Sequence, residues 1–192
     1  RPDVQKSLTL QANTGDTPVI DPSTSGIAVT LSANTITLDG LTIRGWTGTG
    51  LPGVYASGRD QLTIKNCIIH TPSASDTYAN ISIRNSTRVL IQNNQIYGNV
   101  GGAGITSIAG HSTNATYANG TIITSNIIHD NNVDGIQIHG EYHTIENNSI
   151  YRNINTDWAT THPDGIQASY GTVDGIEGNN HVIIRNNLIY SH

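Results

Sequence analysis

Apolar and polar residues alternate in six segments of the chain that superpose on one another without gaps. These segments are residues 36–44, 62–70, 89–97, 121–129, 143–151 and 182–190. Their consensus is apolar-x-Ile-x-Asn-Asn-x-Ile-Tyr/His, and the alternation places its two Ile positions, for example Ile64 and Ile69, on one side. A third motif, Gly-apolar-x-x, begins at Gly26, Gly53, Gly104, Gly135 and Gly165, with a Gly-less version at Asn80. Each repeat therefore predicts three short strands.

The repeats indicate that the strands stack as successive coils, which bury the Ile columns against their neighbours. The first Asn of each pair, and Gly40 in the same column, suits the left-handed backbone conformation that Gly and Asn tolerate best. The second Asn points inward and can form a ladder of side-chain amides from coil to coil. The ladder residues are Asn94, Asn126, Asn148 and Asn187.

This pattern predicts an all-β fold, a right-handed single-stranded parallel β-helix that forms a three-sheet solenoid of about six to seven coils. The right hand follows from the strong bias of parallel crossover connections. We expect a single domain over residues 1–192, with a first coil in 1–35 and repeated coils in 36–192. Both ends lack the polar caps of a solenoid. We therefore expect a fragment of a longer helix, with end-to-end contact to missing coils or another subunit.

Composition narrows the classes of function. Only 12% of the 192 residues are charged, the formal net charge is −5, and the basic residues are scattered singly. Nucleic-acid binding needs clustered positive charge, so we expect no nucleic-acid partner. No apolar run approaches the roughly 20 residues that cross a bilayer, so we expect no membrane partner. The absence of Met indicates that a leading segment was removed, and we expect a secreted or cell-surface protein.

The chain resembles the right-handed parallel β-helix superfamily, the pectate-lyase-like group of carbohydrate-binding proteins and sugar hydrolases. The resemblance rests on residues 36–45, on the repeated Asn-Asn-x-Ile-Tyr/His units and on the segment 7–21. It covers nearly the whole chain. Members of this superfamily include polysaccharide lyases, glycosidases, uronate epimerases, phage tailspikes and adhesins. The resemblance therefore implies the architecture and leaves the chemistry open.

The longest insertions, residues 108–120, 152–163 and 170–180, border the strands that follow Gly104, Gly135 and Gly165. Loops carry specificity in a solenoid, so we expect a groove over this sheet. Its outward residues on two successive coils are Asp134, Gln137 and His139, then Asp164, Gln167 and Ser169. Adjacent strands lie roughly 4.7–4.9 Å apart. Asp134 should therefore stand over Asp164 and Gln137 over Gln167, with Thr106 and Ser82 continuing the line.

The two stacked carboxylates allow several kinds of chemistry. They could bind Ca²⁺ through oxygen ligands, raise each other's pKa, or act as the acid and nucleophile of a glycosidase. Alternatively, an Asp before Gly can simply open a turn and accept hydrogen bonds from the backbone. The Gln pair could likewise be a stabilising amide stack.

The passage before Gln167 adds a carboxylate, an indole and an imidazole, in Asp157, Trp158 and His162. Sugar rings pack on aromatic faces, and His is the usual proton carrier near neutral pH. We therefore take His162, Asp164 and Asp134 as candidate catalytic residues. The candidate calcium ligands are Asp134, Asp164 and Asp157. The alternative is that Trp158 only covers the sheet and that His162 shapes a turn.

These residues favour an extracellular carbohydrate-active enzyme that cleaves an acidic polysaccharide, a lyase rather than a glycoside hydrolase. Elimination on a uronate needs a cation, which could be Arg84, Arg59 or a bound Ca²⁺, and a base, which could be His162 or His139. The expected substrate contacts are Gln137, Gln167, His139, Trp158 and Arg84.

Two departures qualify the resemblance. Lyases of the superfamily often use Lys or Arg as the base, but Lys65 falls on another sheet. The adjacent Asp pair of polygalacturonase-like glycosidases is absent. The alternative is a noncatalytic carbohydrate-binding, adhesin or tailspike-like module. A second outward column, formed by His70, Tyr97, His129, Tyr151 and Tyr190, could be a structural stack or a sugar-binding strip.

Overall fold

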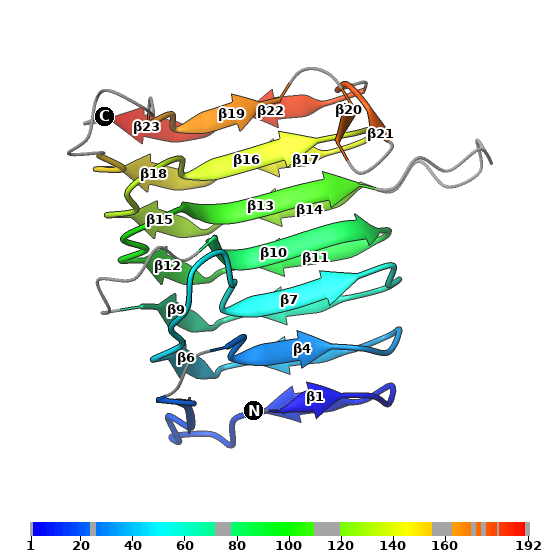
Figure 1. Ribbon diagram of the computed structural model, residues 1–192, viewed down its shortest axis with the longest axis vertical. Helices are drawn as coiled ribbons and strands as arrows, with labels where there is room; N and C mark the ends of the chain where they lie inside the picture. Colours follow the sequence, from blue (N-terminus) through cyan, green and yellow to red (C-terminus); the bar gives the residue numbers. More distant parts are fainter. Residues whose placement is uncertain are drawn as a thin grey trace.

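The strands of each repeat stack on the equivalent strands of neighbouring repeats, and the chain rises as a column of coils (Figure 1). The computed structural model describes residues 2–23, 26–71, 78–109, 120–154, 163–169, 172–173, 176–179 and 181–190. Within them, three parallel sheets of seven strands each run along the column. The predicted all-β, three-sheet parallel β-helix is therefore confirmed.

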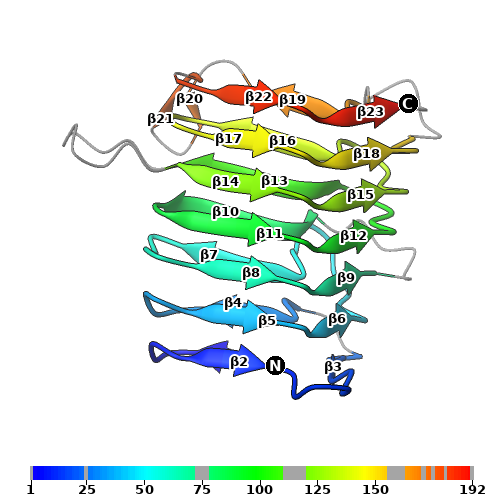
Figure 2. The same ribbon diagram turned by 180° about the vertical axis from the view of Figure 1, so that it is seen from behind.

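Sheet A faces the viewer in Figure 1, and sheets B and C are seen from outside in Figure 2. Sheet A contains β1 (Asp3–Val4), β4 (Val29–Leu31), β7 (Val54–Ser57), β10 (Ala79–Ser86), β13 (Ala103–Ala109), β16 (Ile136–His139) and β19 (Ile166–Ala168). Sheet B contains β2 (Thr9–Gln11), β5 (Thr37–Asp39), β8 (Thr63–Lys65), β11 (Val89–Gln92), β14 (Thr121–Thr124), β17 (Thr144–Glu146) and β22 (Ile183–Arg185). Sheet C contains β3 (Val19–Ile20), β6 (Thr42–Arg44), β9 (Ile68–His70), β12 (Gln95–Tyr97), β15 (Ile127–His129), β18 (Ser149–Tyr151) and β23 (Leu188–Tyr190).

A short antiparallel pair, β20 (Thr172–Val173) and β21 (Ile176–Glu177), lies outside the three sheets. In the part of the chain that the structure describes, no helix has the length and apolar character of a membrane span.

The Ile columns form the core, as the alternation predicts. Ile64 is in register with Ile91, and Ile69 with Ile96, and all four side chains are fully buried. Each buried Ile contributes about 1.5–3 kcal/mol relative to an exposed one, so the columns are a major source of stability. The equivalent residues of the last coil, Ile184 and Ile189, are 49% and 43% exposed. The expected end-to-end contact would cover them, and that contact stays a prediction.

The corner between sheets B and C holds the predicted left-handed residues. The φ angles are 71° at Gly40, 55° at Asn66 and Asn93, 58° at Ser125 and Asn147, and 56° at Asn186. From Asn94 onward, the next residue of each coil forms the predicted amide ladder. Oδ1 of Asn126 accepts hydrogen bonds from the backbone N–H and the Nδ2 of Asn94, at 2.9 and 3.0 Å, and Asn148 and Asn187 continue the same pattern. The ladder ties consecutive coils together through buried groups.

Cys67 occupies the ladder position one coil below Asn94, and its backbone N–H donates to Asn94 Oδ1. The side chain is 1% exposed. Burial raises the pKa of its thiol to about 11. Because the thiolate is the reactive form of Cys, this residue is part of the core rather than a nucleophile.

A second asparagine ladder, which the sequence analysis missed, lies at the corner between sheets C and A. Oδ1 of Asn153 accepts from the backbone N–H of Asn131 at 3.1 Å, and Oδ1 of Asn131 accepts from that of Asn99 at 3.2 Å. The signal is present in the sequence, because each of these residues is the Asn of a Tyr/His-x-Asn triplet that ends the repeat.

The same corner explains the glycine of the third motif. A Cβ on Gly135 would lie 2.5 Å from Cγ2 of Ile150 and 2.7 Å from the carbonyl oxygen of Gly165. Asn80 takes the equivalent place with its side chain inward, where Nδ2 donates to the carbonyl oxygen of Tyr97 at 3.0 Å. The third motif therefore marks the start of each sheet A strand, where the backbone passes close to atoms of the corner.

Candidate functional site

One outward column of sheet A follows the predicted line of residues. Tyr55, Ser82, Thr106, Gln137 and Gln167 are successive register partners on β7, β10, β13, β16 and β19. Gln137 Nε2 donates to Gln167 Oε1 at 2.5 Å, which confirms the predicted stacking of the two amides. The sequence analysis placed Ser82 and Thr106 on this line but did not include Tyr55, although the same alternation identifies it.

A second outward column brings Arg84 and His139 onto one line. Ile108 pairs with Arg84 on one side and with His139 on the other, so one apolar residue separates the cation from the imidazole. His139 is 2% exposed, and its Nδ1 lies 3.2 Å from the carbonyl oxygen of Ser169. When Nδ1 donates this bond, the neutral ring keeps its lone pair on Nε2.

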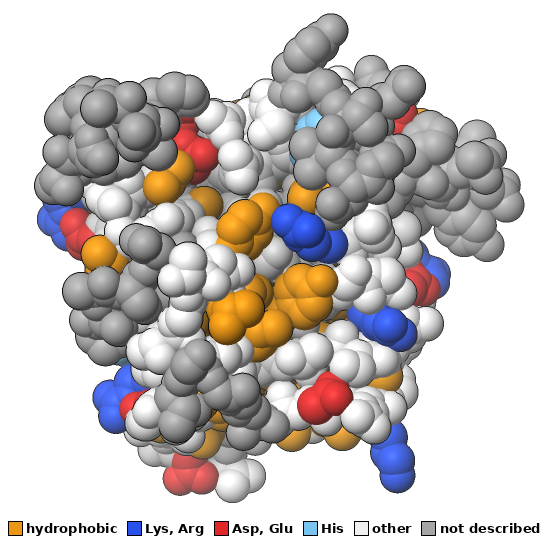
Figure 3. Space-filling model, in the orientation of Figure 1, with side chains coloured by type: hydrophobic (Ala, Val, Ile, Leu, Met, Phe, Trp, Pro, Cys, Tyr) orange, Lys and Arg blue, Asp and Glu red, His pale blue; other side chains and the backbone are white. Residues whose placement is uncertain are grey.

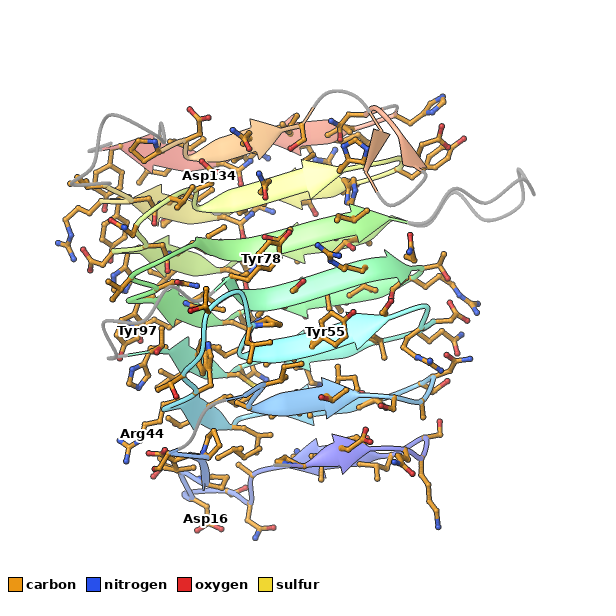
Figure 4. All side chains as sticks on the ribbon, viewed as in Figure 1. Asp16, Arg44, Tyr55, Tyr78, Tyr97 and Asp134 are labelled. Atoms are coloured by element: carbon orange, nitrogen blue, oxygen red, sulfur yellow. The ribbon has the colours of Figure 1, made fainter. Side chains whose placement is uncertain are left out.

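Tyr78 stands over this face just before β10. Arg84 Nη2 donates to the Tyr78 hydroxyl oxygen at 3.3 Å, and the guanidinium carbon lies 5.4 Å from the ring centroid. Figure 4 shows Tyr55 and Tyr78 on the same face, with Asp134 towards the start of β16. Nothing in the repeat identifies Tyr78, because it precedes the strand and has no counterpart in the consensus.

A hollow of about 220 Å³ lies between the two columns. Its lining residues are Tyr78, Thr106, Ile108, Gln137, Ile138, His139 and Ser169. In Figure 3, apolar side chains gather near the centre of this face, with Lys or Arg side chains beside them. The hollow therefore combines an aromatic ring, an aliphatic side chain, polar groups and an imidazole.

Two hydroxyl groups under this face have no hydrogen-bond partner among the described residues. Ser82 and Thr106 are 1% and 2% exposed, and their hydroxyl oxygens make no hydrogen bond in the structure as described. A buried polar group that lacks a hydrogen bond costs about 1–3 kcal/mol. No described residue offsets this cost for the two hydroxyl groups on the outer side of sheet A.

The two predicted carboxylates have different surroundings. Asp134 is 1% exposed, and its Oδ1 accepts a hydrogen bond from the backbone N–H of Asp164 at 2.9 Å. Asp164 Oδ2 accepts from Gln167 Nε2 at 3.4 Å. The contact of Asp134 favours the turn-capping alternative for this residue. Among the described residues, no three His, Cys, Asp or Glu side chains gather in a way that could hold a metal ion.

Three of the predicted site residues, Asp157, Trp158 and His162, lie outside the described residues. Their predicted roles in calcium binding, sugar stacking and proton transfer remain predictions. The predicted site residues that the structure describes are Arg84, Asp134, Gln137, His139, Asp164 and Gln167, and Tyr78 and Ile108, which the sequence analysis did not identify, join them on this face.

The aromatic column on sheet C is a continuous stack. Ring centroids are 4.8 Å apart for His70 and Tyr97, 4.9 Å for Tyr97 and His129, and 5.0 Å for His129 and Tyr151. Tyr151 and Tyr190 are also 5.0 Å apart. Each inner ring uses both faces on its neighbours, so no inner face is available to a sugar ring. This arrangement favours the structural interpretation of the column.

Charged residues flank this stack. Arg152 donates two hydrogen bonds to Asp130, at 2.8 and 2.7 Å, and His129 Nδ1 lies 2.6 Å from Asp130 Oδ2. The hydrogen bonds from Arg152 are the main reason that the pKa of Asp130 falls to about 2. Asp130 is therefore ionised at neutral pH and is an ion-pair partner rather than a proton donor.

Comparison with known proteins places the fold. The family model described as "Right handed beta helix region" matches residues 11–192. Among solved structures, the chain is similar to the A-module of the mannuronan C-5 epimerase AlgE4 from Azotobacter vinelandii, with 14% identity and a TM-score of 0.31 over 98% of this chain and 81% of that one. No curated protein sequence matches significantly. Since the family model spans nearly the whole chain, the chain belongs to the right-handed β-helix family.

Proposed function

We propose that this chain is a secreted or cell-surface carbohydrate-active enzyme that binds an acidic polysaccharide over sheet A and cleaves it by β-elimination. The observation that carries the proposal is the hollow beneath Tyr78, which joins an aromatic wall to His139 and to the polar groups of Thr106 and Gln137. Binding sites for small ligands typically combine apolar and aromatic walls with a few placed polar groups.

The residues around the hollow suit the two sides of a sugar ring. The C–H face of a pyranose packs on an aromatic ring such as Tyr78, and its hydroxyl groups need partners such as Gln137. Arg84 does not line the hollow, but its hydrogen bond to Tyr78 holds the guanidinium at the wall. There it can attract the carboxylate of a uronate through charge-assisted hydrogen bonds.

His139 is the described residue best suited to act as the base. In a β-elimination, Nε2 takes the proton from C5 of the uronate and the electron pair forms the C4–C5 double bond. The bond between C4 and the glycosidic oxygen breaks, and the imidazolium returns its proton to the departing oxygen. One imidazole can therefore balance both proton transfers. His162 remains the second candidate for the same role.

Calcium is part of the proposal through Asp134, Asp164 and Asp157. Carboxylate oxygens are ligands that Ca²⁺ prefers, and a cation here would help to bind an acidic chain. The described residues supply two of the three carboxylates. The ion would add positive charge near the uronate carboxylate.

A noncatalytic binding module is the second candidate. The observation that favours it is that Gln137 and Gln167 bond to each other, and that Asp134 bonds to the backbone of Asp164. In that case these groups hold the coils together and the hollow only recognises a saccharide.

The direct test is the ultraviolet absorbance of unsaturated uronate products from pectate, alginate and glycosaminoglycans, with and without Ca²⁺. We expect a rise with one substrate class, and at least about 100-fold slower product formation in His139→Gln. His181→Ala is the control, because this exposed His stacks on Tyr142 and neither residue lines the hollow. New reducing ends without absorbance would indicate hydrolysis instead. Binding without either product would favour the noncatalytic module.

A further inference from the structure

Some buried hydroxyl groups have a hydrogen-bond partner among the described residues, and others have none. Inside the solenoid, the hydroxyls of Ser107 and Thr121 are fully buried and lie 2.7 Å apart, so each has a partner. On the outer side of sheet A, the buried hydroxyls of Ser82 and Thr106 have no partner in the structure as described. Thr106 lines the hollow, whereas neither Ser82 nor Thr121 is among its lining residues.

The two unpartnered hydroxyls are neighbours. Ser82 and Thr106 are register partners on β10 and β13, and adjacent strands lie about 4.8 Å apart. Hydroxyl hydrogen bonds measure about 2.7–2.8 Å. The pair can therefore reach the same oxygen, or two neighbouring oxygens, of one ligand placed above them.

The size and walls of the hollow limit what that ligand is. At about 220 Å³ it is smaller than the roughly 300–1,000 Å³ of pockets for drug-sized molecules, so it suits one ring rather than an oligomer. Ile108 beside Thr106 and the Tyr78 ring give it apolar surfaces, while Gln137 continues the polar line. A pyranose, which has an apolar C–H face and several hydroxyl groups, suits these walls.

We infer that Thr106, which lines the hollow, and its register partner Ser82 on the neighbouring strand form a hydroxyl pair at a subsite for a single pyranose unit, and that this pair selects the hydroxyl pattern of the sugar. The inference rests on the proposed function, since it assigns the specificity of the same site. The stability lost in the free protein is recovered when the sugar hydroxyls complete the two hydrogen bonds. A sugar that lacks a hydroxyl at this place leaves both protein groups unpaired and is rejected.

The test uses substitutions with opposite expected effects. Thr106→Val keeps the shape of the side chain and removes the unpartnered hydroxyl, and Ser82→Ala does the same one strand away. We expect each variant to melt at the same temperature as the wild type or higher, and to bind the preferred oligosaccharide about 3- to 10-fold more weakly. Thr121→Val is the matched control. It removes a paired hydroxyl, so it should lower the melting temperature and leave the dissociation constant unchanged.

The probes are trisaccharides of galacturonate, mannuronate, guluronate and glucuronate, followed by a neutral glycan array, with affinity measured by calorimetry. Unchanged affinity in both Thr106→Val and Ser82→Ala, while the wild type binds, would overturn the subsite and leave the proposed function standing. Binding of neutral glycans alone, weakened by the same substitutions, would support the subsite and overturn the acidic substrate. A wild type that binds no saccharide overturns both.

Discussion

The carboxylate of Asp134 accepts a hydrogen bond from the backbone N–H of Asp164, one coil further along the chain, at 2.9 Å. The two residues lie two positions before the equivalent strands β16 and β19, and the backbone N–H of Gly135 also donates to the carbonyl oxygen of Asp164 at 2.8 Å. The side chain of Asp134 and the main chain of Gly135 therefore both bond to the backbone of Asp164. This hydrogen bond favours a structural role for Asp134, and a substitution that keeps the acceptor can distinguish that role from a catalytic one.

We expect Asp134→Asn to fold and to retain product formation at saturating Ca²⁺, because the amide oxygen can still accept the N–H of Asp164. Asp134→Ala removes the acceptor and should lower the free energy of unfolding by about 1–3 kcal/mol. Denaturant unfolding and turnover of the two variants check this. Lost turnover in a stable Asp134→Asn protein would show that the carboxylate takes part in the chemistry.

The asparagine ladder gives a second prediction. Asn126 accepts two hydrogen bonds from Asn94, and its Nδ2 donates to Ile91 and Asn148. Asn126→Ala leaves several buried groups unpaired, so we expect the free energy of unfolding to fall by about 3 kcal/mol or more. Asn13→Ala, at an exposed position, is the control and should change little. Equal stability of the two variants would mean that the ladder does not hold the coils together.

His143 gives a prediction about pH. This side chain is fully buried, its Nε2 lies 3.0 Å from the carbonyl oxygen of His139, and its Nδ1 has no partner in the described structure. Burial lowers the pKa of His143 below the ordinary histidine value of 6.5. Above pH 6.5, His143 is mostly neutral in both the folded and the unfolded chain. As the pH falls below it, the unfolded chain binds a proton that the folded chain does not, so stability falls.

We therefore expect the melting temperature to drop between pH 7.5 and pH 5. In His143→Val, which matches the Val found at the same repeat position in residues 89 and 182, this drop should be smaller. Differential scanning fluorimetry at several pH values measures it. Parallel pH curves for the wild type and the variant would exclude His143 as a source of the acid sensitivity.

Calcium is tested by its effect on stability. A cation that binds only the folded protein stabilises it, and the gain grows with its concentration. We expect added Ca²⁺ to raise the melting temperature, a chelator to reverse the rise, and Asp157→Asn to reduce it. Mg²⁺ at equal ionic strength controls for screening. The same melting curve with Ca²⁺ and with chelator would show that the calcium prediction is wrong.

Much of the fold could be predicted because its determinants repeat. The alternation at Ile64 and Ile69, the left-handed position at Asn66 and the ladder at Asn94 are local patterns that recur in each coil. The pairing of Gln137 with Gln167 follows from the same register. The Tyr/His-x-Asn triplets that form the second ladder also repeat, and they could have been found in the same way.

The candidate site was only partly predictable. Alternation assigned Thr106, Gln137 and His139 to one face, because a side chain's face depends only on its place in a strand. It did not show that Thr106 and His139 are nearly fully buried. Tyr78 precedes its strand and belongs to no repeat, so no pattern indicated that it would stand over this face and hold Arg84.

The sequence by itself determined the coil, the register and the sides on which residues lie, since these follow from period-two alternation and recurrence in the chain. Only the tertiary structure decided which outward groups are covered and which are paired. Ser82 and Thr121 look equivalent as small hydroxyl residues in strands. Among the described residues, the Ser82 hydroxyl on the outer face has no hydrogen-bond partner and the Thr121 hydroxyl is bonded to Ser107, because their partners depend on which side chains the fold brings beside them.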